Sequence, residues 1–196
     1  MDDARGLQLP ARPDRSAQLV DPTAFDALFD AFTHRTFRLE SLQSYAVSVE
    51  DARLRAFREG TPRPERSVRT DPWLRRIAVS TAAGKSWGRV HLVRHPLSEY
   101  LRYELVSYVE SQAVGEQIGI VDLADFPLLT GPDFWLFDWD TDHPQAVVMH
   151  YSSDGQVQGR EHVVDPSRIE ELNQRRTAVE AAAVALNTYL TVARSA

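Results

Sequence analysis

The sequence predicts an α/β fold with a mixed sheet and a long C-terminal helix, and three observations support this prediction. Asp-Pro pairs, which typically begin helices, recur along the chain and are separated by short β-branched and aromatic runs. The order helix, strand, helix, strand from Trp73 to Val121 is typical of a parallel crossover. Asp154-Gly155 suits a tight turn and lies between two apolar runs, which predicts an antiparallel hairpin.

Each element is predicted from its apolar spacing and from the residues that begin or end it. The first half is expected to contain a flexible leader (1–20), a helix from Asp21-Pro22 to about Thr36, one or two strands (37–49), a short helix (51–59), a basic loop (61–70) and a helix from Asp71-Pro72 to Gly84. The second half is expected to contain a strand (89–93), a helix capped by Ser98 and ended by Gly115, a short strand (118–121), an aromatic strand (134–137) and a hairpin (146–151 and 157–164). Residues 21–164 are therefore assigned to the α/β domain and residues 165–196 to the C-terminal helix.

The composition argues against several classes of function. The net charge of -6 opposes general binding to nucleic acid, which needs a basic surface. Without cysteine, the chain has no thiol nucleophile and no thiolate ligand for a metal. Residues 1–10 lack the apolar segment of a signal peptide, and the C-terminal helix is too polar to span a bilayer. We therefore expect a cytoplasmic protein without membrane contact.

The densest polar cluster lies at the end of a predicted strand and the start of the helix that follows it. Ligands tend to bind at this position in open α/β sheets, and a helix N-terminus favours an anion. The candidate ligand-binding residues here are Arg94, His95, Tyr100, Arg102 and Glu104. The competing interpretation is a surface helix with a Glu–Arg pair and with tyrosines that pack their rings.

The aromatic strand Asp133-Phe-Trp-Leu-Phe-Asp138 supplies three further candidates, Asp133, Trp135 and Asp138. Side chains alternate along a strand, so Asp133 and Trp135 share one face and Asp138 shares the other with Phe134. An acidic side chain directed into a pocket beside an arginine would recognise a polar ligand. The competing interpretation is a core strand bounded by acidic turn residues.

No cofactor, metal site or catalytic residue is expected. Of the six histidines, none forms His-x-x-x-His on a predicted helix and none forms His-x-Glu. Ala83-Gly-Lys-Ser86 resembles the end of a phosphate-binding loop, but Val79 stands where the first glycine belongs and the segment follows a helix.

The C-terminal helix carries a near-heptad apolar seam. Its members are Ile169, Leu172, Val179, Ala183, Leu186 and Leu190. At 1.5 Å per residue, a helix from Pro166 to Ala193 would be roughly 40 Å long. Two interpretations of this helix are open. It forms a homodimer or partner contact, or it simply packs across the sheet.

Two of these segments resemble an actinobacterial family that carries no established activity. The segments are His95-Pro-Leu-Ser-Glu-Tyr-Leu-Arg-Tyr-Glu104 and Asp133-Phe-Trp-Leu-Phe-Asp138, with Pro132 where the family usually has asparagine. The resemblance covers about residues 25–164. Members are often encoded beside helix-turn-helix regulators, so the resemblance implies a regulatory role and such a regulator as a partner.

The order of elements is also similar to one half of a phospholipase D-like domain. Catalysis in that superfamily needs His-x-Lys, whereas the single lysine, Lys85, has Ala83 two residues before it. The resemblance therefore implies a fold of this kind without its phosphodiesterase chemistry, as in sensor domains that only bind.

Together these patterns predict a non-catalytic regulatory or ligand-sensing module that binds a small polar ligand, a partner transcription regulator, or both. The alternative is a small-molecule enzyme of specialised metabolism. Its acid–base groups would be Glu104, Asp133 or Asp138 with His95 or His150.

Overall fold

A mixed sheet is the centre of the fold in the computed structural model, which describes residues 18–193. Its eight strands, counted over those residues, are ordered β1-β7-β6-β5-β2-β3-β4-β8. They are β1 (Gln18–Leu19), β2 (Arg35–Glu40), β3 (Ser86–Val93), β4 (Glu116–Asp122), β5 (Asp133–Phe137), β6 (Gln145–Tyr151), β7 (Val157–Val163) and β8 (Val184–Ala185). β2, β3 and β4 pair in parallel and the remaining neighbours pair antiparallel, which confirms the predicted α/β class and mixed sheet.

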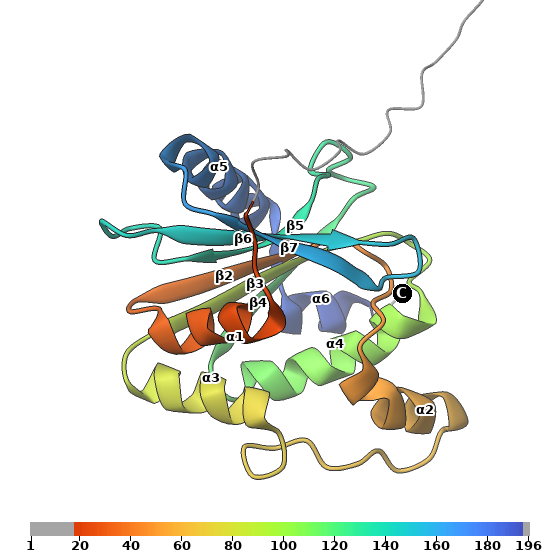
Figure 1. The fold of residues 1–196 in the computed structure, drawn as a ribbon. Helices are drawn as coiled ribbons and strands as arrows, with labels where there is room; N and C mark the ends of the chain where they lie inside the picture. The colour runs from red at the N-terminus through yellow and green to blue at the C-terminus, as the bar shows by residue number, and fades with distance from the viewer. Residues whose placement is uncertain (1–17, 194–196) are drawn as a thin grey trace, which may run out of the picture.

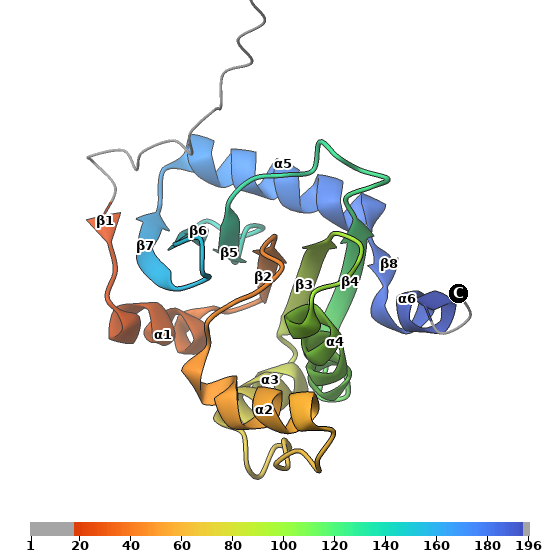
Figure 2. The same cartoon turned by 90° about the vertical axis from the view of Figure 1, so that its right-hand side faces the viewer.

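Helices cover both faces of this sheet, as Figures 1 and 2 show. They are α1 (Pro22–Ala31), α2 (Asp51–Glu59), α3 (Pro72–Ala82), α4 (Glu99–Gln112), α5 (Pro166–Ala182) and α6 (Leu186–Ala193), with a 3₁₀ turn η1 (Ser48–Glu50) before α2. α5 lies across one face, and α1, α3 and α4 lie against the other, with α2 outside them and α6 beside α4 at the β8 edge. None of these helices is long and apolar enough to cross a membrane, within residues 18–193.

The predicted helix starts are confirmed by side-chain caps. Asp21 and Asp71 each accept two backbone N–H groups of the first turn, Asp165 accepts one, and a proline follows each of them. Ser98 accepts the backbone N–H of Leu101 and begins α4. Such caps satisfy donors that have no partner inside the helix, which is why these signals locate the helix starts from sequence.

The two faces of the sheet have different chemistry. Against α5 the sheet is apolar, with Phe37 and Leu39 of β2 packed beside Val90 and Leu92 of β3. On the opposite face the same strands present charged and aromatic residues. Strand alternation produces this difference, because successive side chains point to opposite faces.

The prediction of one continuous C-terminal helix was wrong. α5 ends at Ala182, and Val184–Ala185 pairs antiparallel with β4 as β8 before α6 begins. A Cβ at Gly119 of β4 would lie 2.7 Å from the Ala183 Cβ, so the close approach requires glycine there. Edge pairing to β4 therefore replaces two residues of helix.

Most of the expected heptad seam is buried within the chain. Ile169, Leu172 and Val179 pack on the sheet, and Leu186 packs against the α4 side. Packing across the sheet thus accounts for the apolar spacing, and a homodimer through this segment would have to use its exposed faces.

Three other boundaries differ from the sequence prediction. The first helix stops at Ala31 instead of about Thr36, because residues 35–40 pair with both β3 and β5. The predicted strands over residues 37–49 reduce to the part of β2 that ends at Glu40. Of the predicted leader, residues 1–17 lie outside the described residues, and Gln18–Leu19 forms β1 against β7.

Candidate functional site

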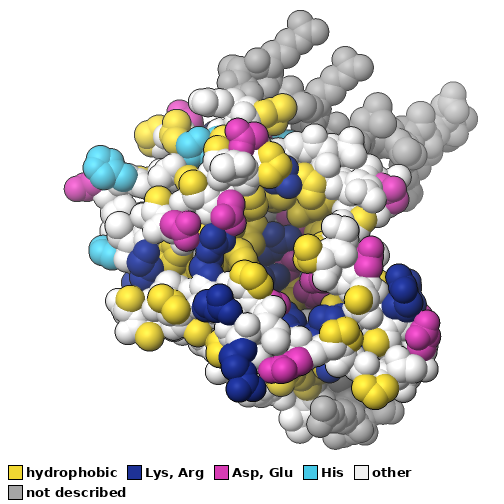
Figure 3. All heavy atoms as spheres, turned by 60° about the horizontal axis from the view of Figure 1, so that its bottom comes forward, with side chains coloured by type: hydrophobic (Ala, Val, Ile, Leu, Met, Phe, Trp, Pro, Cys, Tyr) yellow, Lys and Arg dark blue, Asp and Glu magenta, His cyan; other side chains and the backbone are white. Residues whose placement is uncertain are grey.

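A cavity of about 880 Å³ lies between the sheet and the helices of the α1–α3–α4 side. Its floor comes from β2, β3 and β5, and one wall comes from α4. The other boundaries come from α1, α2, α3, η1, the loop over residues 61–71, residues 45–47 and the β6–β7 hairpin. Figure 3 shows the hollow from this side, with basic and acidic side chains within it and around its rim. The polar lining residues include Arg38, Glu40, Tyr45, Glu50, Arg53, Arg66, Asp71, Arg76, Arg89, Tyr100, Tyr103, Glu104, Ser107, Tyr108 and Tyr151.

The floor of the cavity holds a buried chain of alternating charges. Glu40 lies between two guanidinium groups, 2.7 Å from Arg38 and 2.5 Å from Arg89. Arg89 in turn donates to Glu116 over 2.8 Å. Burial by itself would raise the pKa of Glu40, but Arg38 and Arg89 lower it well below the usual 4.5. Glu40 is therefore a structural anion and is unsuited to proton transfer near neutral pH.

Tyr108 and His91 extend this network beneath the floor. The Tyr108 hydroxyl donates to Glu40 over 2.7 Å and lies 2.7 Å from Nδ1 of His91. Nε2 of His91 lies 2.9 Å from the carbonyl oxygen of Leu42. Burial lowers the pKa of His91, so its ring is neutral at pH 7. A neutral ring has one N–H, and the single Tyr108 proton goes to Glu40, so His91 donates to only one of these two partners. His91 is fully buried and is not among the cavity-lining residues.

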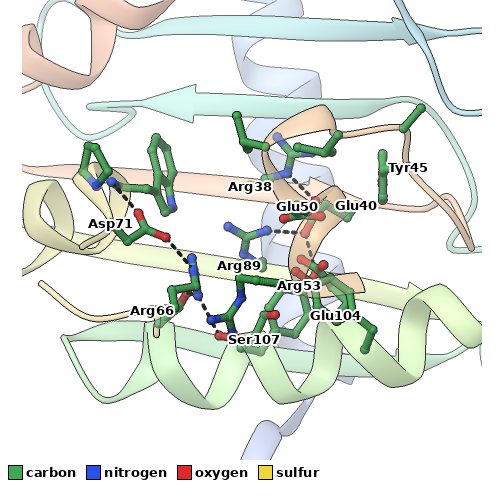
Figure 4. Close-up of a pocket in the computed structure, with 18 of the residues that line it drawn as sticks. Arg38, Glu40, Tyr45, Glu50, Arg53, Arg66, Asp71, Arg89, Glu104 and Ser107 are labelled. Atoms are coloured by element: carbon green, nitrogen blue, oxygen red, sulfur yellow. Dashed lines mark hydrogen bonds and ion pairs between the residues drawn. The ribbon is translucent and has the colours of Figure 1, made fainter. Parts of the chain in front are cut away.

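A second set of ion pairs borders the cavity, and Figure 4 shows one of them, Arg66–Asp71, on the side away from Glu40. Arg53 forms a bidentate pair with Glu110, with contacts of 2.8 and 2.7 Å. Arg66 donates to Asp71 over 2.6 Å and to the carbonyl oxygen of Ser107 over 3.0 Å. These pairs tie the loop before α3 to α4 and thereby fix this side of the cavity.

Two acidic side chains in the cavity have different surroundings. Glu50 accepts a hydrogen bond from the Tyr100 hydroxyl over 3.0 Å. Glu104 is 7 % exposed, and its Oε2 has no hydrogen-bond partner among the described residues. Burial, with the nearby carboxylates of Glu50 and Glu40, raises the pKa of Glu104 to about 8. Burial also raises the pKa of Glu50, which the bond from Tyr100 opposes.

Trp135 and Asp133 border the cavity from β5. Trp135 is 3 % exposed, and its indole Nε1 has no hydrogen-bond partner among the described residues. The Arg38 guanidinium lies 4.9 Å from the Trp135 ring centroid. Asp133 accepts from the hydroxyl of the lining residue Tyr45 and from the backbone N–H of Ser41. Asp133 thus holds Tyr45 in place through this hydrogen bond and is not itself among the lining residues.

The structure brings three of the eight sequence-predicted site residues into the cavity lining, namely Tyr100, Glu104 and Trp135. Asp133 lies one contact away through Tyr45. The remaining four, Arg94, His95, Arg102 and Asp138, are not among the lining residues.

Those four residues have local contacts elsewhere. Arg94 is exposed, and Arg102 is exposed and donates to the carbonyl oxygen of Leu97. His95 is exposed and lies 3.1 Å from the Tyr189 hydroxyl of α6. Asp138 accepts the backbone N–H groups of residues 33–35, at the opposite end of β2 from Glu40.

The sequence interpretation missed the charged floor, formed by Arg38 and Glu40 of β2 with Arg89 of β3. A signal was present, because Arg38-x-Glu40 and Arg89-x-His91 each place two ionisable residues on one face of a strand. Ionisable residues on a covered sheet face have to be paired, and a paired cluster inside a domain indicates a candidate site. Glu50 carried no comparable signal.

The chain matches the model of the family described as Domain of unknown function (DUF6879) over residues 23–191. That match spans most of the chain, so the protein belongs to this family. No curated protein matches the chain.

Proposed function

We propose that this member of the DUF6879 family is a non-catalytic regulatory module that binds a small polar ligand in the cavity between the sheet and α4. The observation that carries this proposal is a set of unpartnered polar atoms on residues that line one cavity, among them Glu104 Oε2 and the donor Trp135 Nε1–H. Leaving a buried polar group without a hydrogen bond costs about 1–3 kcal/mol, so a ligand that pairs with both groups would recover this cost.

The size and composition of the cavity agree with a ligand of metabolite size. Small-molecule sites occupy about 300–1,000 Å³ and combine apolar walls with a few convergent polar groups. Here the walls contain Phe25, Phe29 and Trp73, and the polar groups lie on β2, β3 and α4. The ion pairs of the floor hold that geometry before any ligand binds.

The sequence resemblances add the regulatory part of the proposal. Relatives encoded beside helix-turn-helix regulators imply that such a regulator is the partner that senses the liganded state. The similarity in element order to half of a phospholipase D-like domain agrees with binding in place of catalysis, because Lys85 contacts the carbonyl oxygen and ring of Phe32 and is not among the cavity-lining residues.

One observation favours an enzyme as the second candidate. A carboxyl group with a pKa of about 8 suits general acid–base catalysis, and Glu104 has such a pKa. The histidines expected to assist are elsewhere, because His95 is paired with Tyr189 and Asp122 and His150 with Glu161. An enzyme here would therefore use carboxyl and tyrosine groups.

The test is recovery of the full-length protein from its native cells, followed by mass spectrometry of bound small molecules and proteins. Wild type is compared with Glu104→Gln and Trp135→Phe, each of which removes one unpartnered group. Trp139→Phe is the matched control, because Trp139 packs with the core on the α5 side.

We expect one compound to be enriched on wild type and on Trp139→Phe, and to fall at least fivefold on the two cavity variants. Equal recovery on all folded variants, or no enriched compound, contradicts the proposal. If wild type converts the recovered compound chemically and Glu104→Gln does not, the protein is an enzyme and the proposal of a non-catalytic module is wrong.

A further inference from the structure

The arginines that line the cavity are all matched by acidic partners, within the part of the chain that the structure describes. The pairs are Arg38–Glu40, Arg53–Glu110, Arg66–Asp71, Arg76–Asp26 and Arg89–Glu116. The positive charge of each lining guanidinium is therefore already compensated by a carboxylate, although Nε of Arg38 and Nε of Arg53 have no hydrogen-bond partner among the described residues.

Two acidic lining residues lack the corresponding basic partner. Neither Glu50 nor Glu104 forms an ion pair with any described residue, whereas Glu40 has two. The Glu104 side chain comes from α4 and the Glu50 side chain from η1, and Figure 4 shows both at the end of the cavity that also holds Glu40. The carboxyl groups without a basic partner therefore lie at the same end of the cavity.

We infer, building on the proposed function, that the ligand carries a protonated amino group that is bound between Glu104 and Glu50 at the α4 end of the cavity. An ammonium group has three N–H donors and one positive charge. It would donate to the unpartnered Oε2 of Glu104 and to Glu50, which now accepts only from Tyr100 within the described residues. The contact between the ammonium group and these carboxyl groups would be an ion pair, like those that Arg38 and Arg89 form with Glu40.

The surroundings of the two carboxyl groups favour a cation in preference to a neutral or anionic group. Tyr45, Tyr100 and Tyr103 form a buried aromatic cluster beside them, and aromatic faces attract cations. The charged neighbours of Glu104 are Glu50 and Glu40, which repel an anion, and Arg89, which is already paired with Glu40 and Glu116. An amino group adds the positive charge that this end lacks.

Proton release gives the inference a distinctive readout. With a pKa of about 8, Glu104 carries a proton at pH 7, and an incoming ammonium group would displace that proton. Amine binding is then accompanied by release of up to about one proton at pH 7, and by less above about pH 9.

The experiment uses aryl- and alkylamines as probes, each with its hydroxyl and carboxylate analogue, in ligand-observed NMR and then calorimetry in buffers of different ionisation enthalpy. We expect amines to bind wild type at least tenfold more tightly than their hydroxyl analogues, with proton release at pH 7. Glu104→Gln is expected to lose at least tenfold in amine affinity and to lose the proton release. Glu50→Gln is the second variant, and the exposed Glu99→Gln on the same helix is the control that leaves both unchanged.

Amines that bind no better than alcohols, or amine affinity unchanged in both cavity variants, would overturn the inference. If alcohols or carboxylates bind instead and Trp135→Phe abolishes their binding, the proposed function is supported, but the ligand is not an amine. If no probe binds, and if the protein recovered from native cells carries no enriched compound, both the proposed function and the inference of an amine ligand are refuted.

Discussion

Replacement of Asp138 by alanine is expected to destabilise the fold and leave the cavity intact. The Asp138 carboxylate accepts the backbone N–H groups of Thr33, His34 and Arg35 over 2.6, 2.7 and 3.0 Å, and the Thr33 hydroxyl over 2.9 Å. It thereby fastens the connection between α1 and β2 to the end of β5. Asp138 also has φ 50, a left-handed conformation that alanine adopts poorly.

The magnitude follows from these contacts. A hydrogen bond to a charged group contributes about 1.5–3 kcal/mol, but residues 33–35 are exposed and water replaces part of each bond. We take about 1 kcal/mol for each of the three backbone donors, and up to about 1 kcal/mol for alanine in the left-handed region. The expected loss of about 3–4 kcal/mol lowers Tm by about 10 °C in a chain of this length.

The same contacts set the pH dependence of this effect. Burial opposes ionisation of Asp138, but the backbone N–H groups of residues 33–35 lower its pKa below the usual 3.8. Because the folded-state pKa is the lower one, the stabilisation is present above the unfolded-state value and is lost as pH falls through the folded-state value. The stability difference between wild type and Asp138→Ala should therefore shrink below about pH 4.

Urea denaturation followed by circular dichroism at pH 7 and at pH 3 measures both effects. Asp138→Asn is the control, since asparagine tolerates the left-handed region and keeps one acceptor oxygen, and it should lose about 1 kcal/mol. A loss below about 1 kcal/mol in Asp138→Ala would refute the structural role. Lost ligand binding in a folded Asp138→Ala protein would instead support the sequence-based prediction that Asp138 binds ligand.

Three further predictions concern stability. The pKa of Glu104 is raised in the fold, so wild type should lose up to about 1.4 kcal/mol per pH unit relative to Glu104→Gln between its unfolded-state pKa and about pH 8; a parallel pair of stability curves would contradict this. Glu116→Gln should cost about 3 kcal/mol in urea denaturation, because it leaves the buried Arg89 with less compensation, and a cost under 1 kcal/mol would argue against the charged floor. Gly155→Ala should lower Tm more than Gly84→Ala, since both glycines have positive φ but only a Cβ at Gly155 would lie 2.6 Å from the Ser44 carbonyl oxygen; equal losses would count against that close approach.

Much of the fold was predictable from sequence because its signals are local. Asp21, Asp71 and Asp165 cap the helices that follow them through atoms two or three residues away. The aromatic strand was likewise predicted from a short aromatic run, and the hairpin from two apolar runs around Asp154-Gly155. Interactions of this range do not depend on the rest of the chain.

The candidate site was predicted at Trp135 of the aromatic strand and at two residues that share an inward face of α4. Tyr100 and Glu104 are four residues apart on α4 and both line the cavity, whereas Arg102 between them is exposed. Helical spacing places Tyr100 and Glu104 on one face and Arg102 on another, but it does not say which of these two faces borders a cavity. Packing made that choice when Leu101, Leu105 and the residues around them were buried.

The sequence by itself determined the α/β class, the helix starts and the strand that carries Trp135, since these depend on caps, periodicity and turn residues within a few positions. The tertiary structure decided where the C-terminal helix breaks, because Val184 pairs with β4 instead of continuing the helix. It also decided which charges meet, because Glu40, Glu50 and Glu104 come from β2, η1 and α4. Charge pairing and desolvation depend on distances between such segments, and those distances are set only when the sheet and helices have packed.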